Sequence, residues 1–399
     1  MIDYEKELNP EQLRVVLEEG GPLLVIAGAG SGKTRTLTYR VARLVESGVP
    51  PERILLATFT NKAARSMLTR VETLIGREIG GLWGGTFHHC AHRTLRSHAT
   101  RLGYAANFSI LDSEDARQLI NNCIAETGID GKGDKFPRGD VVGDMVSLAV
   151  NTELPLLDVV AGRYPFFAHR SEEIAAVAAH YRKRKKELNV MDFDDLLFLW
   201  RELLLRFDDV RDFYAGRFLH VLVDEYQDTN RLQAEIMDLV ASRHRNLMVV
   251  GDDSQSIYSF RGANYENIMR FPDRYPECKI FKLETNYRST PEILHLANLS
   301  ITNNERQFQK TLRAVREGGI RPVLAPARNV LQQADFVAQR ILELNRSGIP
   351  LGEIAVLYRA HYHSMEVQME LTRRGIPFEI RSGIRFFEQA HIKDVTAYL

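Results

Sequence analysis

The stretch "PLLVIAGAGSGKT" at residues 22–34 joins an apolar run to a glycine-rich turn that ends in Lys33 and Thr34. This order predicts a buried strand that leads into the N-terminus of a helix, where backbone N–H groups and the helix dipole face bound phosphates. Lys33 would reach the β- and γ-phosphates of a nucleoside triphosphate, and the Thr34 hydroxyl would bind Mg²⁺. The strict pattern has Gly in place of Ala27, and Ala is acceptable there if φ stays negative. The predicted phosphate-binding loop comprises Ala27, Gly28, Ala29, Gly30, Ser31, Gly32, Lys33 and Thr34.

A pair of adjacent carboxylates follows a second apolar run in "VLVDEYQD". Asp224 and Glu225 would lie at the carboxyl end of a strand, where parallel sheets bind their ligands. Asp224 would hold Mg²⁺ through water, and Glu225 would act as the general base for an attacking water. A strand-end Asp-Glu pair is also a common helix cap, and only its position after a phosphate-binding loop favours the catalytic interpretation.

A third strand leads into a polar turn in "VVGDDSQSIYSFRGAN" (249–264). The Gln255 amide would contact both the γ-phosphate and the attacking water. Tyr258, Phe260 and Arg261 add aromatic faces and a cation on which unpaired bases would stack. A loop anchored in the core by its apolar residues fits this segment equally well.

The stretch "LETNYRST" (283–290) follows a further strand. Arg288 would neutralise charge on the γ-phosphate in the transition state, and Tyr287 would stack on the adenine. Taken alone, a Tyr-Arg pair is also typical of an ordinary surface.

Two strand ends carry residues suited to a nucleic-acid backbone. "ATFTNKAA" (57–64) places Phe59 and Asn61 at one of them, and "GTFHHCAHRTLR" (85–96) places Thr86 and His88 at the next. Hydroxyl, amide and basic groups there would contact phosphates. The histidines of the second stretch have no nearby cysteine or acidic ligand, so a zinc site is not expected.

A basic run, "YRKRKKEL" (181–188), is predicted on a helix. It is either a solvated helix face or a contact for duplex phosphates.

Short apolar runs alternate with helical patterns in two parts of the chain. Strands are predicted at 22–27, 53–59 and 82–87, with a helix over 61–75 after the second. The pattern turns helical from about 110 to 205, with a loop at 128–140, and strands resume within 218–230, 246–256 and 278–284. This order predicts one α/β domain with a parallel sheet and a helical insertion.

A further α/β segment is expected from near residue 285. Its best predicted strands are "RPVLAPA" (321–327) and "EIAVLYRA" (353–360), and "HIKDVTAYL" at 391–399 has a helical pattern.

The composition is that of an ordinary globular chain of 399 residues with 26% charged residues and a formal net charge of zero. Bulk charge therefore predicts no partner, and any contact with nucleic acid depends on local patches. The three cysteines are widely spaced, which argues against a structural zinc site or a disulfide framework. Neither a secretion signal nor a membrane span is expected. A cytoplasmic protein, monomeric in isolation, is the expectation.

These stretches, in this order, resemble the UvrD/Rep/PcrA family of superfamily 1 DNA helicases. The resemblance covers essentially the whole chain. It rests on "LNPEQ" (8–12), "AGAGSGKT" (27–34), "TFTNKAA" (58–64), "GTFH" (85–88), "DFDDLL" (192–197), "VDEYQDTN" (223–230), "GDDSQSIYSFRGA" (251–263), "LETNYRST" (283–290) and "IAVLYRA" (354–360).

The resemblance implies two RecA-like α/β domains, each with an inserted helical domain, and ATP in the cleft between them. The expected organisation is a first RecA-like P-loop NTPase domain at 1–108 and 206–283, an all-helical insertion at 109–205, and an incomplete second RecA-like domain at 284–399.

The resemblance also assigns site residues. Gln12 would bind the adenine edge, while Tyr287 and Arg35 would sandwich the ring. Gln255 and Arg288 would link the γ-phosphate to closure of the cleft. The single-strand track would comprise Phe59, Asn61, Thr86, His88, Tyr258, Phe260 and Arg261. The implied activity is ATP-dependent 3′ to 5′ movement on single-stranded DNA, with unwinding at single-strand/duplex junctions during repair or replication.

The chain departs from the family pattern in two ways. Phe260 stands where family members usually carry Trp, and the phenyl ring offers a smaller stacking face than an indole. Two later family motifs, one that contacts DNA and one with a second γ-phosphate arginine, have no match in the sequence. We therefore expect an N-terminal portion of a longer helicase, with weak ATP binding, very slow hydrolysis and no unwinding. Alternatives are the helicase part of a recombination helicase–nuclease and a module that only binds ATP or DNA.

Overall fold

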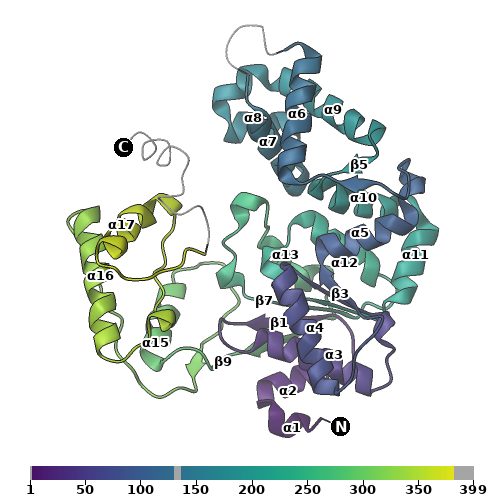
Figure 1. Ribbon diagram of the computed structural model, residues 1–399. Helices are drawn as coiled ribbons and strands as arrows, with labels where there is room; N and C mark the ends of the chain where they lie inside the picture. Colours follow the sequence, from purple (N-terminus) through teal and green to yellow (C-terminus); the bar gives the residue numbers. More distant parts are fainter. Residues whose placement is uncertain (1, 130–135, 382–399) are drawn as a thin grey trace. The chain divides into compact units, whose positions relative to one another are not determined.

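The computed structural model describes residues 2–129 and 136–381 (Figure 1). The chain divides into two compact units, Met1–Ile320 and Arg321–Leu399. The 391–399 segment, predicted as helical, lies outside the described residues.

A six-stranded sheet forms the centre of the first unit, and all of its neighbouring strands are parallel. The strand order is β3-β2-β6-β7-β1-β8. These strands are β1 (Leu23–Ala27), β2 (Ile54–Thr58), β3 (Trp83–Thr86), β6 (His220–Val223), β7 (Leu247–Gly251) and β8 (Lys279–Leu283). Each predicted strand of the first α/β domain is confirmed. Because parallel strands end at the same edge, the polar turns after them meet there.

Helices cover both faces of this sheet, because successive side chains of a strand point to opposite faces. Along β1, Leu23 and Val25 pack with α3 (Lys33–Glu46) and α4 (Asn61–Ile75). Leu24 and Ile26 belong to a core on the opposite face. Its helices are α5 (Phe87–His98), α10 (Phe193–Arg206), α11 (Asp208–Arg217) and α12 (Arg231–Ala241). The sheet is thus buried on both sides, as its continuous apolar strands require.

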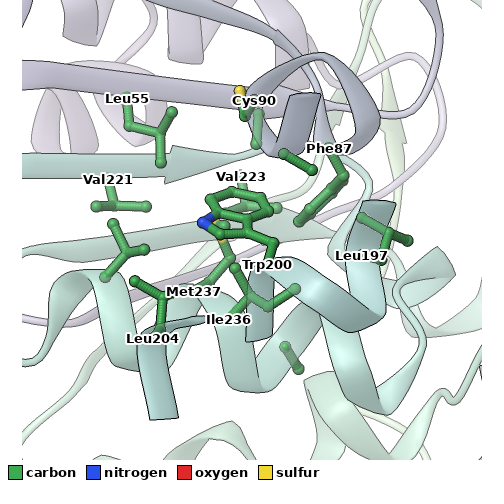
Figure 2. Close-up of a cluster of buried hydrophobic side chains, with 14 of the residues drawn as sticks. Leu55, Phe87, Cys90, Leu197, Trp200, Leu204, Val221, Val223, Ile236 and Met237 are labelled. Atoms are coloured by element: carbon green, nitrogen blue, oxygen red, sulfur yellow. The ribbon is translucent and has the colours of Figure 1, made fainter. Parts of the chain in front are cut away.

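The indole of Trp200 lies at the centre of this second core (Figure 2). It is surrounded by Val221 and Val223 of the sheet and by Phe87 of α5. Trp200 belongs to α10, within the stretch predicted to be helical. Its burial shows that α10 packs on the sheet.

The remaining helices between 110 and 190 have a core of their own. They are α6 (Ser113–Thr127), α7 (Gly139–Thr152), α8 (Leu156–Arg163) and α9 (Ser171–Glu187). The chain enters and leaves this group through two short parallel strands, β4 (Ser109–Ile110) and β5 (Val190–Met191).

The lengths and apolar character of the helices decide whether any of them meets what a membrane-spanning helix requires. Among the described residues, no single helix is long and apolar enough to cross a membrane; the pair α7 and α8, bent by 116°, passes that test together on length and composition only.

The basic run at 181–188 lies mainly on α9. Its Lys185 is buried, and Lys185 Nζ lies 2.5 Å from a carboxylate oxygen of both Asp192 and Asp195. Burial lowers the pKa of Lys185, but these carboxylates outweigh it and raise the pKa above its ordinary value. Lys185 is therefore committed to an internal ion pair and does not belong to a solvated basic face.

The first unit is completed by short elements at its two ends. They are α1 (Tyr4–Glu7), α2 (Pro10–Leu17), α13 (Glu266–Met269), α14 (Phe271–Arg274), β9 (Thr285–Asn286), α15 (Pro291–Ile301) and β10 (Arg313–Ala314). β9 and β10 pair in parallel.

In the second unit, α16 (Val330–Arg346) packs on α17 (Met365–Arg373) around Ala338, Ile341 and Leu371. The strands predicted at 321–327 and 353–360 are wrong for the described residues, which have no regular strand there. A strand exists only where a neighbour completes its backbone hydrogen bonds. Neither segment has such a neighbour among the described residues, and Leu324 and Leu357 are 90% and 93% exposed despite their apolar pattern.

Candidate functional site

The predicted chemical residues lie on turns at the carboxyl edge of the sheet. β6, β7, β1 and β8 are consecutive in the strand order. Asp224 and Glu225 follow β6, and Gln255 lies in the turn after β7. The phosphate-binding loop follows β1, and Arg288 lies in the turn after β8. Segments far apart in sequence are thereby brought together, with the loop between the turns of β7 and β8.

The loop at 27–34 has the backbone of a phosphate cradle. Gly30 and Gly32 have φ of +75° and +86°, a region that side chains rarely adopt. A Cβ on Gly30 would lie 2.6 Å from the Cβ of Arg288, so the chain also approaches too closely for a side chain. Gly32 caps α3 without a side-chain hydrogen bond, which leaves the first helical N–H groups available to an anion. Ala27 ends β1 in ordinary strand pairing, so its substitution for Gly causes no strain.

Lys33 and Glu225 form an ion pair beneath this loop. Lys33 Nζ lies 2.6 Å from Glu225 Oε2, and the lysine side chain is 10% exposed. Glu225 has φ of +50°, an uncommon conformation for a residue with a side chain and one often found at functional sites.

Asp224 lies almost fully buried beside Glu225. Burial, and after it the charge of Glu225, raise the pKa of Asp224 to about 7, against the opposing charge of Lys33. A buried carboxylate of this kind is stabilised by a bound cation.

Gln227 is a site residue that the sequence reasoning missed. Its side chain is buried, donates to Glu225 Oε2 at 2.9 Å, and accepts from the Asp252 backbone N–H at 2.9 Å. Asp252 Oδ2 in turn accepts from the Gln255 amide at 2.5 Å. Glu225 and Gln255 are thus linked through two residues, the Gln227 side chain and the backbone and side chain of Asp252. The only sequence signal was the position of Gln227 within "DEYQD".

The turn after β8 is bonded directly to the phosphate-binding loop. Asn286 Nδ2 donates to the Ala29 carbonyl at 2.5 Å, and the Tyr287 N–H donates to the Gly30 carbonyl at 2.9 Å. The Arg288 backbone is therefore held against the loop. Asn286 was not singled out from the sequence, although it precedes the predicted Tyr-Arg pair.

The residues expected around adenine also meet at this end of the loop. Gln12 Nε2 donates to the Ser31 carbonyl at 3.0 Å, and its Oε1 accepts from the Asn9 backbone in a capping box. The Tyr287 hydroxyl accepts from Asn9 Nδ2 at 2.7 Å. Arg35 donates to the Glu7 carboxylate at 2.8 Å. Gln12, Arg35 and Tyr287 are thus close to the loop, but each already has a protein partner.

Several of the residues expected to contact nucleic acid after β2 and β3 already contact other protein groups. The Phe59 ring packs on Phe87, with ring centroids 5.5 Å apart. The Thr86 hydroxyl caps α5 by accepting from the His89 N–H. His88 lies edge-on to Phe193, and burial lowers its pKa against the opposing charge of Asp194. Asn61 is the first residue of α4.

The aromatic residues after β7 are more open. Phe260 is 67% exposed and Tyr258 is 41% exposed, and their ring centroids lie 6.0 Å apart. Arg261 ends the short 3₁₀ helix Ser259–Arg261, but its side chain lies outside what the structure describes. Both aromatic residues are therefore substantially exposed to solvent.

The family model described as "UvrD/REP helicase N-terminal domain" matches residues 8–276 of the sequence. The model described as "UvrD-like helicase C-terminal domain" matches residues 281–399. The chain belongs to the UvrD/Rep helicase family. The resemblance inferred from the motifs is confirmed, as is the α/β fold with a parallel central sheet.

The chain is also similar to several curated proteins named ATP-dependent DNA helicase PcrA. It is 38% identical to that of Staphylococcus epidermidis strain RP62A over 99% of this chain and 53% of the relative. It is 41% identical to that of Bacillus subtilis strain 168 over 98% of this chain and 52% of the relative. The chain spans about half the length of the curated relatives that it matches.

Proposed function

We propose that this chain belongs to a DNA motor that couples hydrolysis of ATP to 3′ to 5′ movement on single-stranded DNA, and to unwinding of duplexes in repair or replication. The observation that carries the proposal is the Lys33–Glu225 ion pair beneath the phosphate-binding loop. The pair supports the proposal because it joins the lysine that would bind phosphate to the carboxylate that would act as general base. The helicase names of the relatives support the same activity.

The residues at the loop fit Mg²⁺ and a triphosphate. Thr34 and Asp224 supply hydroxyl and carboxylate oxygens, the donors that Mg²⁺ prefers. The glycines of the loop carry no side chains that would cover its backbone N–H groups, which are the donors that phosphates bind. When bound, Mg²⁺ would neutralise charge on the β- and γ-phosphates.

Hydrolysis begins, in this proposal, with an exchange of partners. The γ-phosphate draws Lys33 away from Glu225, which then accepts a proton from the attacking water. Gln227 remains bonded to Glu225 and keeps the carboxylate oriented. Arg288, held near the loop by its backbone, stabilises the charge that develops on the transferred phosphoryl group.

Coupling to DNA follows from the neighbouring turns. Gln255 precedes Tyr258 and Phe260 in one short segment, so movement of the Gln255 amide with the γ-phosphate shifts two stacking faces. Bases would stack on these rings without sequence preference. Phe59, Asn61, Thr86, His88 and Arg261 would extend the track.

We further propose that the 399 residues alone hydrolyse ATP slowly and do not unwind DNA. The sequence has no match to the family motif that supplies a second γ-phosphate arginine. A transition-state cation of this kind is worth ~10³–10⁵ in rate.

Phosphate release, measured with and without single-stranded DNA, tests the proposal. Single turnovers with enzyme in excess over ATP detect slow hydrolysis. Lys33→Ala should abolish turnover, whereas Lys279→Ala, an exposed lysine on β8, should leave it unchanged. Turnover that survives Lys33→Ala would overturn the assignment to this site. DNA and ATP binding without any turnover would favour a binding module.

A further inference from the structure

Residues 308–316, which we call the clasp, run along the candidate site after α15. At one end, the Phe308 N–H donates to Asp253 Oδ2 at 3.2 Å. At the other end, Arg316 donates to the Arg288 carbonyl at 2.8 Å. The clasp therefore joins the turn after β7 to the turn after β8.

Lys310 is the central polar contact of the clasp. Its Nζ lies 2.9 Å from Asp252 Oδ1 and 2.7 Å from Asp253 Oδ1, and also donates to the Ser254 hydroxyl at 2.9 Å. The side chains of Lys310, Asp252 and Asp253 are all 5% exposed or less. Such a buried arrangement is sensitive to loss of one partner, which leaves the other charges uncompensated.

The Asp252 carboxylate connects this lysine to Gln255. Lys310 binds one oxygen of Asp252, while the Gln255 amide binds the other at 2.5 Å. The Gln255 backbone N–H also donates to the Asp252 carbonyl at 2.9 Å. The position of the Gln255 side chain thus depends on how Lys310 holds Asp252.

The clasp also contacts the phosphate-binding loop. A Cβ on Gly28 would lie 2.3 Å from a methyl carbon of Leu312, so this side chain covers the loop backbone. β10, in the clasp, pairs with β9, whose Asn286 donates to the Ala29 carbonyl. One short segment therefore touches both the phosphate cradle and the turn that carries Gln255.

We propose that Lys310 is a positioning residue that orients Gln255 for recognition of the γ-phosphate, and that the clasp thereby lets the site distinguish ATP from ADP. This inference rests on the proposed function, because it requires a nucleotide at the loop. Under this proposal, Lys310 does not contact the nucleotide. It acts through Asp252.

The test compares affinity for ADP with affinity for the non-hydrolysable analogue AMP-PNP, both with Mg²⁺, in the 399-residue chain. Lys310→Met should reduce the preference for AMP-PNP by about tenfold while the ADP affinity stays unchanged. Lys310→Gln, which keeps a hydrogen-bond donor, should give an intermediate value. Lys279→Met is the matched control, since that lysine is exposed and pairs with Glu18 on another part of the surface.

A double-mutant cycle with Gln255→Ala then tests the route. If Lys310 acts through Gln255, Lys310→Met should have little further effect in the Gln255→Ala background. Additive effects, equal losses for both nucleotides, or an unchanged preference would each overturn the inference. If Lys310→Met does not fold, Lys310→Gln carries the same test. Failure of the proposed function is distinct, because nucleotide binding would then be insensitive to Lys33→Ala.

Discussion

Lys33 Nζ and Glu225 Oε2 lie 2.6 Å apart, although the two residues are 192 positions apart in the sequence. The pair gives each residue a partner when no nucleotide is present. A γ-phosphate must compete for the lysine, and its success leaves the carboxylate without its cation. In the proposed mechanism, the base thus becomes available only after the substrate has bound.

Replacement of Glu225 separates binding from turnover. Glu225→Gln should lower the hydrolysis rate by ~10²–10⁴, because an amide cannot accept the proton of the attacking water. Affinity for ATP should not fall, because Lys33 loses a charged competitor. Single-turnover phosphate release and nucleotide titration measure the two effects. Glu305→Gln, an exposed site after α15, is the control, and wild-type turnover in Glu225→Gln would contradict a role as base.

Gly30→Ala should weaken nucleotide binding. The new Cβ would lie 2.6 Å from the Arg288 Cβ and 2.9 Å from Asn286 Nδ2, at a φ of +75°. Strain of this kind costs ~1–3 kcal/mol. The free loop relieves it by relaxing, and nucleotide binding must restore the cradle, so affinity falls by roughly 5- to 150-fold. Gly80→Ala introduces the same methyl group into open space and should bind normally. Equal nucleotide titrations for the two variants would show that the loop tolerates a side chain.

Phe260→Ala should weaken binding of single-stranded DNA. Loss of one stacking face costs ~1–3 kcal/mol per base, and Phe260→Trp should tighten binding by offering a larger face. Fluorescence anisotropy with an oligonucleotide measures both changes. Phe166→Ala removes another highly exposed ring, in the helical insertion, and should have no effect. A matching loss in Phe166→Ala would mean that the effect is nonspecific.

Because of the partly buried His220, we expect the free energy of unfolding to fall in mild acid. Burial, and after it the charges of Arg40 and His244, lower the pKa of His220 to about 4. Between pH 6.5 and 4 the unfolded chain binds a proton that the folded chain does not, so stability falls as pH falls, by up to about 1.4 kcal/mol per pH unit. His220→Gln should therefore show a smaller drop in thermal midpoint between pH 7 and 5. The exposed His295→Gln should behave like the wild type; an unchanged pH dependence in His220→Gln would exclude this source.

The sequence was sufficient for the sheet of the first unit and for the turns that carry Lys33, Glu225 and Gln255. Local patterns encode these features: continuous apolar strands and the glycines of a phosphate-binding loop. It was not sufficient for Gln227 or Lys310, because their roles depend on partners that only the strand order brings near. The prediction of strands at 321–327 and 353–360 was wrong for a related reason. Apolar alternation shows that a segment can pair, but a partner must also be present.

The short β4–β5 pair has a consequence for how such a protein can change over time. It brings Ser109 beside Val190, and Ile110 beside Met191, at the two ends of the segment that holds α6 to α9. A segment whose ends already meet can lengthen or shorten at small entropic cost, since loop closure depends only weakly on length. It also has a separate core. Evolution can therefore exchange or remodel this cassette while the nucleotide-binding sheet keeps its form.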